Sequence, residues 1–166
     1  MNGVLDPMVA NDDTATGSED SSFAIPASAL LANDVRGDGA ALTLEAITGT
    51  NICAAGFDGT SVIVTCANNY EGPDAWFDYQ VSDGVTSDIA RVALTIAGVN
   101  DAPQVSDEDF TGTEDTPIDI TAAELLANDL DADGDTLTIT GFSAYGGATV
   151  TRVGDVFTFT PALDAV

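Results

Sequence analysis

The sequence lacks histidine and lysine, and its three basic residues are all arginines: Arg36, Arg91 and Arg152. The missing imidazole and amine exclude histidine general bases, Schiff-base lysines and histidine metal ligands. No apolar run approaches the roughly 18 residues that a membrane-spanning helix needs. We therefore expect no membrane insertion, and most familiar enzyme chemistries have no residue to carry them.

Basic residues are outnumbered by 28 acidic residues, which gives a formal net charge of −25. Such a charge is typical of disordered chains, yet 45% of the residues are hydrophobic and lie in short alternating runs. We interpret the chain as folded, with an acidic surface that repels nucleic acids and attracts cations. Aspartate dominates, with 22 of the 28 acidic residues. Its short side chain suits turns and oxygen cages for calcium.

The chain repeats itself at an offset of 95 residues. Glu19-Asp20 returns as Glu114-Asp115, and Leu30–Asp34 returns letter for letter as Leu125–Asp129. A long fixed period indicates an array of like modules, which is more often a spacer, binder or stalk than an enzyme. We predict a first module at 1–99, a linker at 100–103 and a second module at 104–166.

Short runs rich in Val, Ile, Thr and aromatic residues alternate with Gly, Asp and Asn clusters, which predicts an all-β fold. Each module is expected to be an antiparallel β-sandwich. In the first module we expect strands at 23–25, 42–48, 52–54, 61–67, 76–82 and 88–97. In the second we expect strands at 118–120, 137–142, 148–152 and 156–160. One helical turn is expected in each copy, at 26–31 and 122–127.

The predicted second sandwich is incomplete, because the equivalents of the strands at 76–96 would lie at 171–191. Such a module leaves an apolar groove and open sheet edges. Two interpretations stay open. Either the chain is an excerpt of a longer array, or a strand from a neighbouring molecule completes the module and builds a filament.

The strongest candidates for metal ligands lie in the segment from Asn128 to Asp135. They are Asn128, Asp129, Asp131, Asp133 and Asp135. Alternating carboxylates with a turning glycine suit calcium, but an EF-hand needs glutamate where Thr140 stands, so we predict a calcium loop of another kind. Further candidates are Glu19, Asp20, Glu114 and Asp115, which recur in both copies, and Asp83 in a turn. The alternative is a set of solvated acidic turns.

The first copy departs from this pattern. Arg36 stands where Asp131 stands in the second copy, and Ala40 stands where Asp135 stands. A cation in a ligand position argues against a complete calcium site in the first copy.

The only two cysteines, Cys53 and Cys66, lie on the predicted arms of one hairpin, and the second copy lacks both. We favour a disulfide between them over two free thiols, which implies an oxidising, extracellular setting. Their spacing excludes a zinc or redox site of the Cys-x-x-Cys kind.

Several motifs together resemble the cadherin-like tandem repeats of large bacterial surface adhesins and biofilm proteins. They are Leu30–Asp34, Phe77–Gly84, Val99–Pro103, Asn128–Asp135 and Phe157–Pro161. The resemblance implies immunoglobulin-like sandwiches strung in rows and stiffened by calcium. By motif, it implies one calcium cluster made by Glu19, Asn100, Asp101, Asp131 and Asp133. The cysteines depart from the family, whose repeats usually lack them.

The resemblance implies a calcium-binding structural extender of a secreted or cell-surface adhesin. Its partners are expected to be neighbouring repeats or like subunits, and the adhesin's surface ligand is not identified. Two alternatives remain: a filament subunit completed by strand donation, and a carbohydrate-binding module that uses Trp76, Tyr70 or Tyr145. A hydrolase with paired carboxylates is disfavoured, because the carboxylates cluster in repeated loops and not in a pocket.

Overall fold

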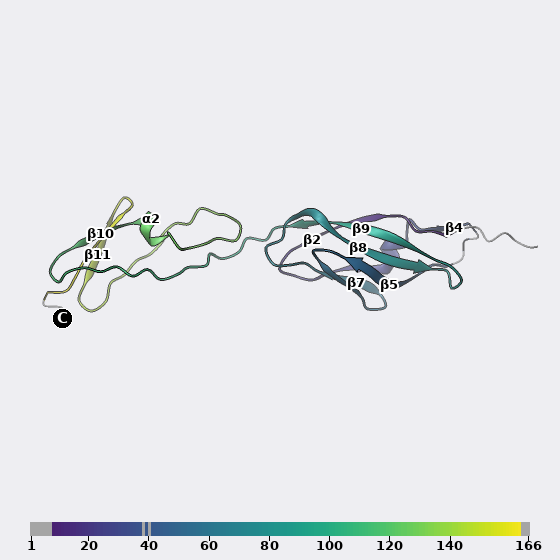
Figure 1. Cartoon of the computed structure of the whole chain (residues 1–166), viewed down its shortest axis with the longest axis horizontal. Coiled ribbons are helices and arrows are strands. Elements are labelled where there is room, and N and C mark those ends of the chain that lie inside the picture. The colour runs from purple at the N-terminus through teal and green to yellow at the C-terminus, as the bar shows by residue number, and fades with distance from the viewer. Residues whose placement is uncertain (1–7, 38, 40, 164–166) are drawn as a thin grey trace, which may run out of the picture. The chain divides into compact units, whose positions relative to one another are not determined.

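The computed structural model describes residues 8–37, 39 and 41–163. The chain divides into two compact units, Met1–Val99 (unit 1) and Asn100–Val166 (unit 2), and each is described by itself. In both units the regular secondary structure is mainly strand, as Figure 1 shows, so the predicted all-β class is confirmed.

Two sheets form the sandwich of unit 1, beside a third sheet of two short strands. The larger sheet has the order β2-β9-β8-β5, with bounds Asp13–Ser18, Ser87–Ala97, Gly72–Ser82 and Thr43–Thr50. The smaller sheet has the order β3-β7-β6, with bounds Phe23–Pro26, Ser61–Thr65 and Ala54–Phe57. A short helix, α1 (Ala27–Leu30), follows β3, and β1 (Met8–Val9) pairs with β4 (Val35–Arg36). The strand predicted at 52–54 corresponds to β6, which begins two residues later than predicted, at Ala54.

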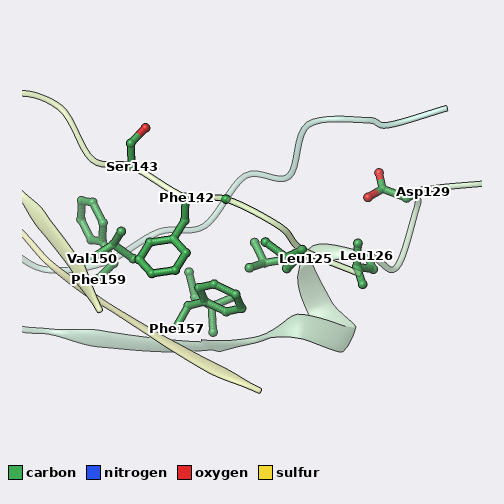
Figure 2. A pocket seen from close by; sticks show the side chains of 11 residues that line it. Leu125, Leu126, Asp129, Phe142, Ser143, Val150, Phe157 and Phe159 are labelled. Atoms are coloured by element: carbon green, nitrogen blue, oxygen red, sulfur yellow. The ribbon is translucent and has the colours of Figure 1, made fainter. Parts of the chain in front are cut away.

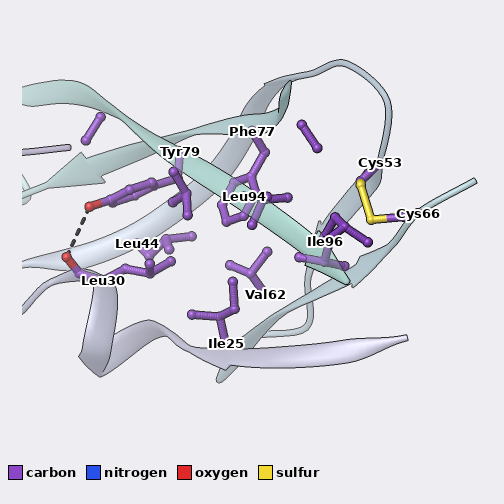
Figure 3. Packing of buried hydrophobic residues seen from close by; sticks show 14 of the residues in the cluster. Ile25, Leu30, Leu44, Cys53, Val62, Cys66, Phe77, Tyr79, Leu94 and Ile96 are labelled. Atoms are coloured by element: carbon purple, nitrogen blue, oxygen red, sulfur yellow. Dashed lines mark hydrogen bonds between the residues drawn. A yellow bond between two sulfur atoms is a disulfide. The ribbon is translucent and has the colours of Figure 1, made fainter. Parts of the chain in front are cut away.

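The core of unit 1 lies where the two sheets face each other, as Figure 3 shows. Phe77, Tyr79 and Val81 alternate along β8 with half-exposed residues, as the sequence predicts for a strand with one buried face. Every second residue of β9 is buried in the same way, from Ala90 to Ile96. Val62 and Val64 of β7 contribute the opposite wall of this core.

Inside this core, the hydroxyl of Tyr79 lies among three acceptors. It hydrogen-bonds to the Asp13 carboxylate at 2.7 Å and to the Leu30 carbonyl at 3.1 Å, and Asp34 lies at 3.4 Å. Burial, together with the hydrogen bond to Asp13, raises the pKa of Tyr79 far above its usual value. Burial likewise raises the pKa of the Asp13 and Asp34 carboxyls. The hydroxyl therefore ties α1 and β2 to the central strand.

Cys53 and Cys66 form a disulfide, which confirms that prediction. Cys53 directly precedes β6 and Cys66 directly follows β7, so the bond closes the open end of this hairpin. Both side chains are buried, and in Figure 3 the disulfide lies at one edge of the core, near Ile96.

Unit 2 contains one three-stranded sheet of the order β10-β12-β11, with bounds Ile118–Thr121, Val156–Thr160 and Thr149–Val153. It reproduces β3-β7-β6 at the offset of 95 residues. The helical turn returns as α2 (Ala122–Leu125). A capping box formed by Thr121 and Glu124 stabilises its N-terminus. A bridge between Gln104 and Leu130 likewise matches the pairing of Val9 with Val35.

The predicted strand at 137–142 is wrong, because the structure has no strand between residues 131 and 148. Its counterpart in unit 1 is β5, which hydrogen-bonds to β8. Unit 2 has no counterpart of β8 among its described residues, so an extended segment there has no partner to form a ladder.

Strand β2, the edge strand that pairs in parallel with β9, was not predicted. Its letters, Asp13 to Ser18, contain only one alanine among polar and glycine residues, so they carry no apolar alternation. Its counterpart at 108–113 forms no strand, because its partner β9 has no counterpart among the described residues of unit 2. The larger sheet of unit 1 is therefore mixed, and not purely antiparallel.

Reduction of the single disulfide should destabilise unit 1. The bond closes a loop with a sequence separation of 13 residues, and a loop of that size is worth about 3 kcal/mol through constraint of the unfolded chain. Urea denaturation with and without reductant measures the loss, and the variant Cys53→Ser with Cys66→Ser should match the reduced protein. A native chain whose stability does not change with reductant would contradict the prediction, and the variant itself should not respond to reductant, since no cysteine remains.

Tyr79→Phe should lower the free energy of unfolding of unit 1 by about 1–3 kcal/mol, because it leaves buried acceptors without their donor. Equilibrium urea unfolding, followed by the fluorescence of Trp76, measures the change. Tyr145→Phe serves as the matched control, because Tyr145 is 86% exposed and should lose nothing measurable.

Candidate calcium-binding residues

Glu19 follows β2 directly and is only 2% exposed. Its backbone N–H donates to the Ala97 carbonyl at 3.2 Å, and its Oε1 accepts the Val99 N–H at 3.1 Å. The other carboxylate oxygen, Oε2, is buried without a hydrogen-bond partner. An unsatisfied buried carboxylate oxygen is costly, so this atom is suited to a cation.

A second carboxylate, that of Glu71, approaches the same place from the segment before β8. A side chain built on Gly98 would meet Glu71 Oε2 at 2.8 Å and Glu19 Oε1 at 3.5 Å. The glycine therefore leaves the space into which both carboxylates reach. Two like charges this close to one point repel each other, and a bound cation would offset the repulsion.

Glu71 was not among the predicted ligands. The repeat could not reveal it, because position 71 corresponds to Val166 in the second copy. The only sequence signal was an acidic residue next to the Gly-Pro that begins β8.

In unit 2, the predicted loop is held by its own backbone. Asp131 Oδ1 accepts the N–H groups of Asp133 and Asp135 at 3.0 and 3.1 Å, and Asp133 Oδ2 accepts the Asp101 N–H at 2.7 Å. The amide of Asn100 donates to the carbonyl of Asp101. The structure thus links Asp101, Asp131, Asp133 and Asp135 through one set of hydrogen bonds.

Asn128 and Asp129 have a structural role that both copies share. Asp129 accepts the Ser106 N–H at 2.9 Å, and Asn128 donates to the Asp107 carbonyl at 3.3 Å. The same contacts occur in unit 1, where Asp34 accepts the Asn11 N–H at 2.7 Å and Asn33 donates to the Asp12 carbonyl at 3.1 Å. These bonds fasten the first segment of each module, which accounts for the repeated Asn-Asp pair without a metal.

The acidic pairs at the start of each copy differ. Asp20 and Asp115 both have a φ of 58°, a left-handed conformation that aspartate tolerates in turns. Glu114 is exposed, unlike its buried counterpart Glu19. Glu19 is held by Ala97 and Val99, at the end of β9, and unit 2 contains no described counterpart of that strand.

Asp83, another predicted ligand, forms an ion pair with Arg36 at 3.0 Å, with side chains 3% and 9% exposed. Asp83 also accepts the N–H groups of Thr86 and Val85. These two backbone bonds, helped by Arg36, lower the pKa of Asp83 to about 2. Arg36, which corresponds to Asp131 of unit 2, thus supplies the positive charge beside Asp83 in unit 1. Asp38 and Ala40 of this loop lie outside the described residues.

The predicted ligands therefore belong to two separate units. Within the residues that the structure describes, no group of three or more acidic or cysteine side chains could hold a metal ion by itself. Glu19 and Glu71 nonetheless fit a cation, since one buried oxygen has no partner and the two carboxylates converge. Calcium takes six to eight oxygen ligands, so backbone carbonyls and water would complete its shell.

The two-sheet architecture of unit 1 and the repeated sheet of unit 2 define a tandem immunoglobulin-like β-sandwich protein. The chain belongs to the bacterial Ig domain family, whose model matches residues 5–95. A model of the cadherin-like domain matches residues 99–165. Both matches agree with a cadherin-like repeat of bacterial surface proteins, so the resemblance stated from the motifs is confirmed.

No curated protein matches the chain. Among solved structures, an endo-fucoidan hydrolase of glycoside hydrolase family 107 is 16% identical with a TM-score of 0.44. The match covers 98% of this chain but only 26% of the hydrolase. Tandem Ig domains of titin are 8% identical with a TM-score of 0.29, covering 96% of this chain and 82% of theirs. The chain thus spans about a quarter of the hydrolase that it matches, and neither likeness bears on function.

The stabilising effect of Asp83 should depend on pH. Its pKa in the folded state is about 2, below the ordinary value of 3.8, so its contribution is present above pH 4 and disappears as the pH falls toward 2. Urea unfolding of the native chain and of Asp83→Asn should therefore differ at pH 5 and converge at pH 2. Asp155→Asn, whose side chain is 90% exposed, should show no such convergence. A constant difference across this range would contradict the assignment.

Proposed function

We propose that the chain is a calcium-binding structural extender repeat of a secreted or cell-surface bacterial adhesin. The observation that carries the calcium part is the buried Glu19 carboxylate, which has one unpartnered oxygen and lies with Glu71 around Gly98. The match to a cadherin-like domain supports it, since such domains are generally calcium binders.

In unit 1, Glu19 and Glu71 would hold the ion, with Val99 keeping Glu19 oriented through its N–H. In unit 2, Asp131, Asp133 and Asp135 would need to turn from backbone amides toward a metal, and Asp101 lies beside them. Calcium supplies two positive charges, which lower the repulsion among carboxylates in a chain of net charge −25.

The extender part rests on the fold and its family. Both matched models describe Ig-like domains and not catalytic ones, and such domains are typical of extracellular surface proteins. The disulfide suits that setting. In the described part of the chain, no helix has the length and apolar character to cross a membrane. Neighbouring repeats or like subunits would be its partners, while another part of the adhesin binds the surface ligand.

A carbohydrate-binding role has less support. Trp76, the best candidate for stacking against a sugar, is half-buried, and the guanidinium of Arg91 lies 3.8 Å from its ring centre. Asp78 holds Arg91 there through hydrogen bonds of 2.7 and 3.0 Å. The tryptophan face is therefore already occupied by a cation–π contact.

Calcium should raise the melting temperature of unit 1, and Glu19→Gln should abolish this rise. At a calcium concentration of 100 times Kd, binding to the folded state alone adds about 2.7 kcal/mol. Glutamine can still accept the Val99 N–H through its amide oxygen, so the variant keeps the local fold but loses the charge. Calorimetric melts in calcium and in excess chelator, together with isothermal titration with calcium chloride, measure both effects.

Glu45→Gln is the matched control, because Glu45 is an exposed glutamate of β5 and its loss should leave the calcium response intact. Glu71→Gln should weaken the response, and Asp131→Asn with Asp133→Asn separates any contribution of unit 2. The proposal fails if calcium changes neither heat nor melting temperature in the native chain. It also fails for this site if Glu19→Gln responds as the native chain does.

A further inference from the structure

Unit 2 contains an open apolar groove of about 330 Å³ between its sheet and the segment that follows α2. Figure 2 shows Leu125, Phe142, Val150 and Phe157 facing one another along it. Phe142 contacts Phe157 edge to face at 5.4 Å, yet remains 51% exposed. A surface this apolar on an otherwise acidic chain indicates a docking site.

The internal repeat identifies what covers the same face in unit 1. Eight groove residues stand 95 positions after residues of the unit 1 core, and six of them show the match: Ile120, Leu125, Ile139, Phe142, Val150 and Phe157 correspond to Ile25, Leu30, Leu44, Ile47, Ala55 and Val62. In unit 1 these six belong to one cluster with the inward residues of β8 and β9. The hairpin β8–β9 therefore occupies, in unit 1, the space that is the groove in unit 2.

A polar contact at the rim of the groove adds specificity to this correspondence. Asp129 lines the groove, and its unit 1 counterpart is Asp34. Asp34 Oδ1 accepts the Asn11 N–H, while its Oδ2 lies 3.4 Å from the Tyr79 hydroxyl of β8. Asp129 Oδ1 accepts the Ser106 N–H in the same way. Its carboxylate is thus placed to receive a tyrosine hydroxyl from an incoming strand.

The strand pairing of unit 1 points to the same occupant. In unit 1, β5 pairs with β8, and β2 pairs with β9. The corresponding segments of unit 2, at 138–145 and 108–113, form no strand. A docked hairpin would offer both of them the ladder partner that they lack.

We infer that the groove of unit 2 is the docking site of a polypeptide β-hairpin with the side-chain pattern of β8–β9. One strand carries Phe-x-Tyr-x-Val, the other carries Val-x-Leu-x-Ile, and the tyrosine hydroxyl bonds to Asp129. The inference is independent of calcium, since the groove and its rim contain none of the residues that hold the proposed ion in unit 1.

The experiment uses the full chain with its own residues 72–97 appended directly after Val166. This fusion places the hairpin at positions 167–192, which keeps the offset of 95 residues. Hydrogen exchange with mass spectrometry should show the amides at 138–145 exchanging on the order of 100-fold more slowly than in the unextended chain. Nile red, a neutral probe of apolar surface, should lose fluorescence for the same reason.

Two control extensions test the pattern itself. In the first control extension, the inward and outward residues of both strands are exchanged. Its composition and length are unchanged, and it should not slow exchange at 138–145. An extension with phenylalanine in place of the appended tyrosine should protect 138–145 less, and Asp129→Asn in the host should reduce protection by a similar factor. The amide oxygen of that asparagine can still accept the Ser106 N–H, so the host loop is retained.

Unchanged exchange at 138–145 in the extended chain would overturn the inference, as would equal protection by the exchanged extension. Analytical sedimentation of the unextended chain tests whether a second copy of the chain fills the groove. A dimer that protects 138–145 without any extension would show that a second copy fills the groove, and not a separate hairpin.

Discussion

The pairing of β8 with β9 is the constraint on which the structure of unit 1 depends. Strand β8 gives the core Phe77 and Tyr79, strand β9 gives it Val92, Leu94 and Ile96, and the two strands supply ladder partners to β5 and β2. A strand leaves its backbone N–H and C=O groups unpaired unless a neighbouring strand hydrogen-bonds to them. The outer strands β2 and β5 therefore depend on their inner neighbours β9 and β8. Unit 2 shows the reverse case: the strands β10, β12 and β11 pair with one another, whereas the residues equivalent to β2 and β5 form no strands.

The role of each acidic residue likewise depends on the hydrogen-bond donors around it. Asp83, Asp129 and Asp131 accept backbone N–H groups, so their charge is used within turns and loops. Such bonds stabilise the ionised carboxylate, as the low pKa of Asp83 shows. Glu19 differs, because one of its buried oxygens has no donor. An acidic composition therefore favours cation binding only in general terms, and the hydrogen bonds indicate which carboxylate oxygen lacks a donor.

Several features could be predicted because they depend on neighbouring residues. The alternation of Phe77, Tyr79 and Val81 places one face inward whatever the partner strand, and the offset of 95 residues predicts which sheet of unit 2 repeats that of unit 1. The disulfide followed from two cysteines on the arms of one hairpin. The strand at 137–142 and the edge strand β2 could not be predicted this way, because each depends on a partner distant in sequence.

The class of fold, the tandem organisation, the acidic surface and the family could all be inferred from the linear chain, since periodicity, composition and motif spacing are properties of the sequence. The tertiary structure alone decided that Glu71 joins Glu19 around Gly98, and that Arg36 pairs with Asp83. It also decided that Asn128 and Asp129 fasten the start of unit 2. The physical reason is that a carboxylate's role depends on which donors surround it, and those donors come from segments up to 80 residues away along the chain.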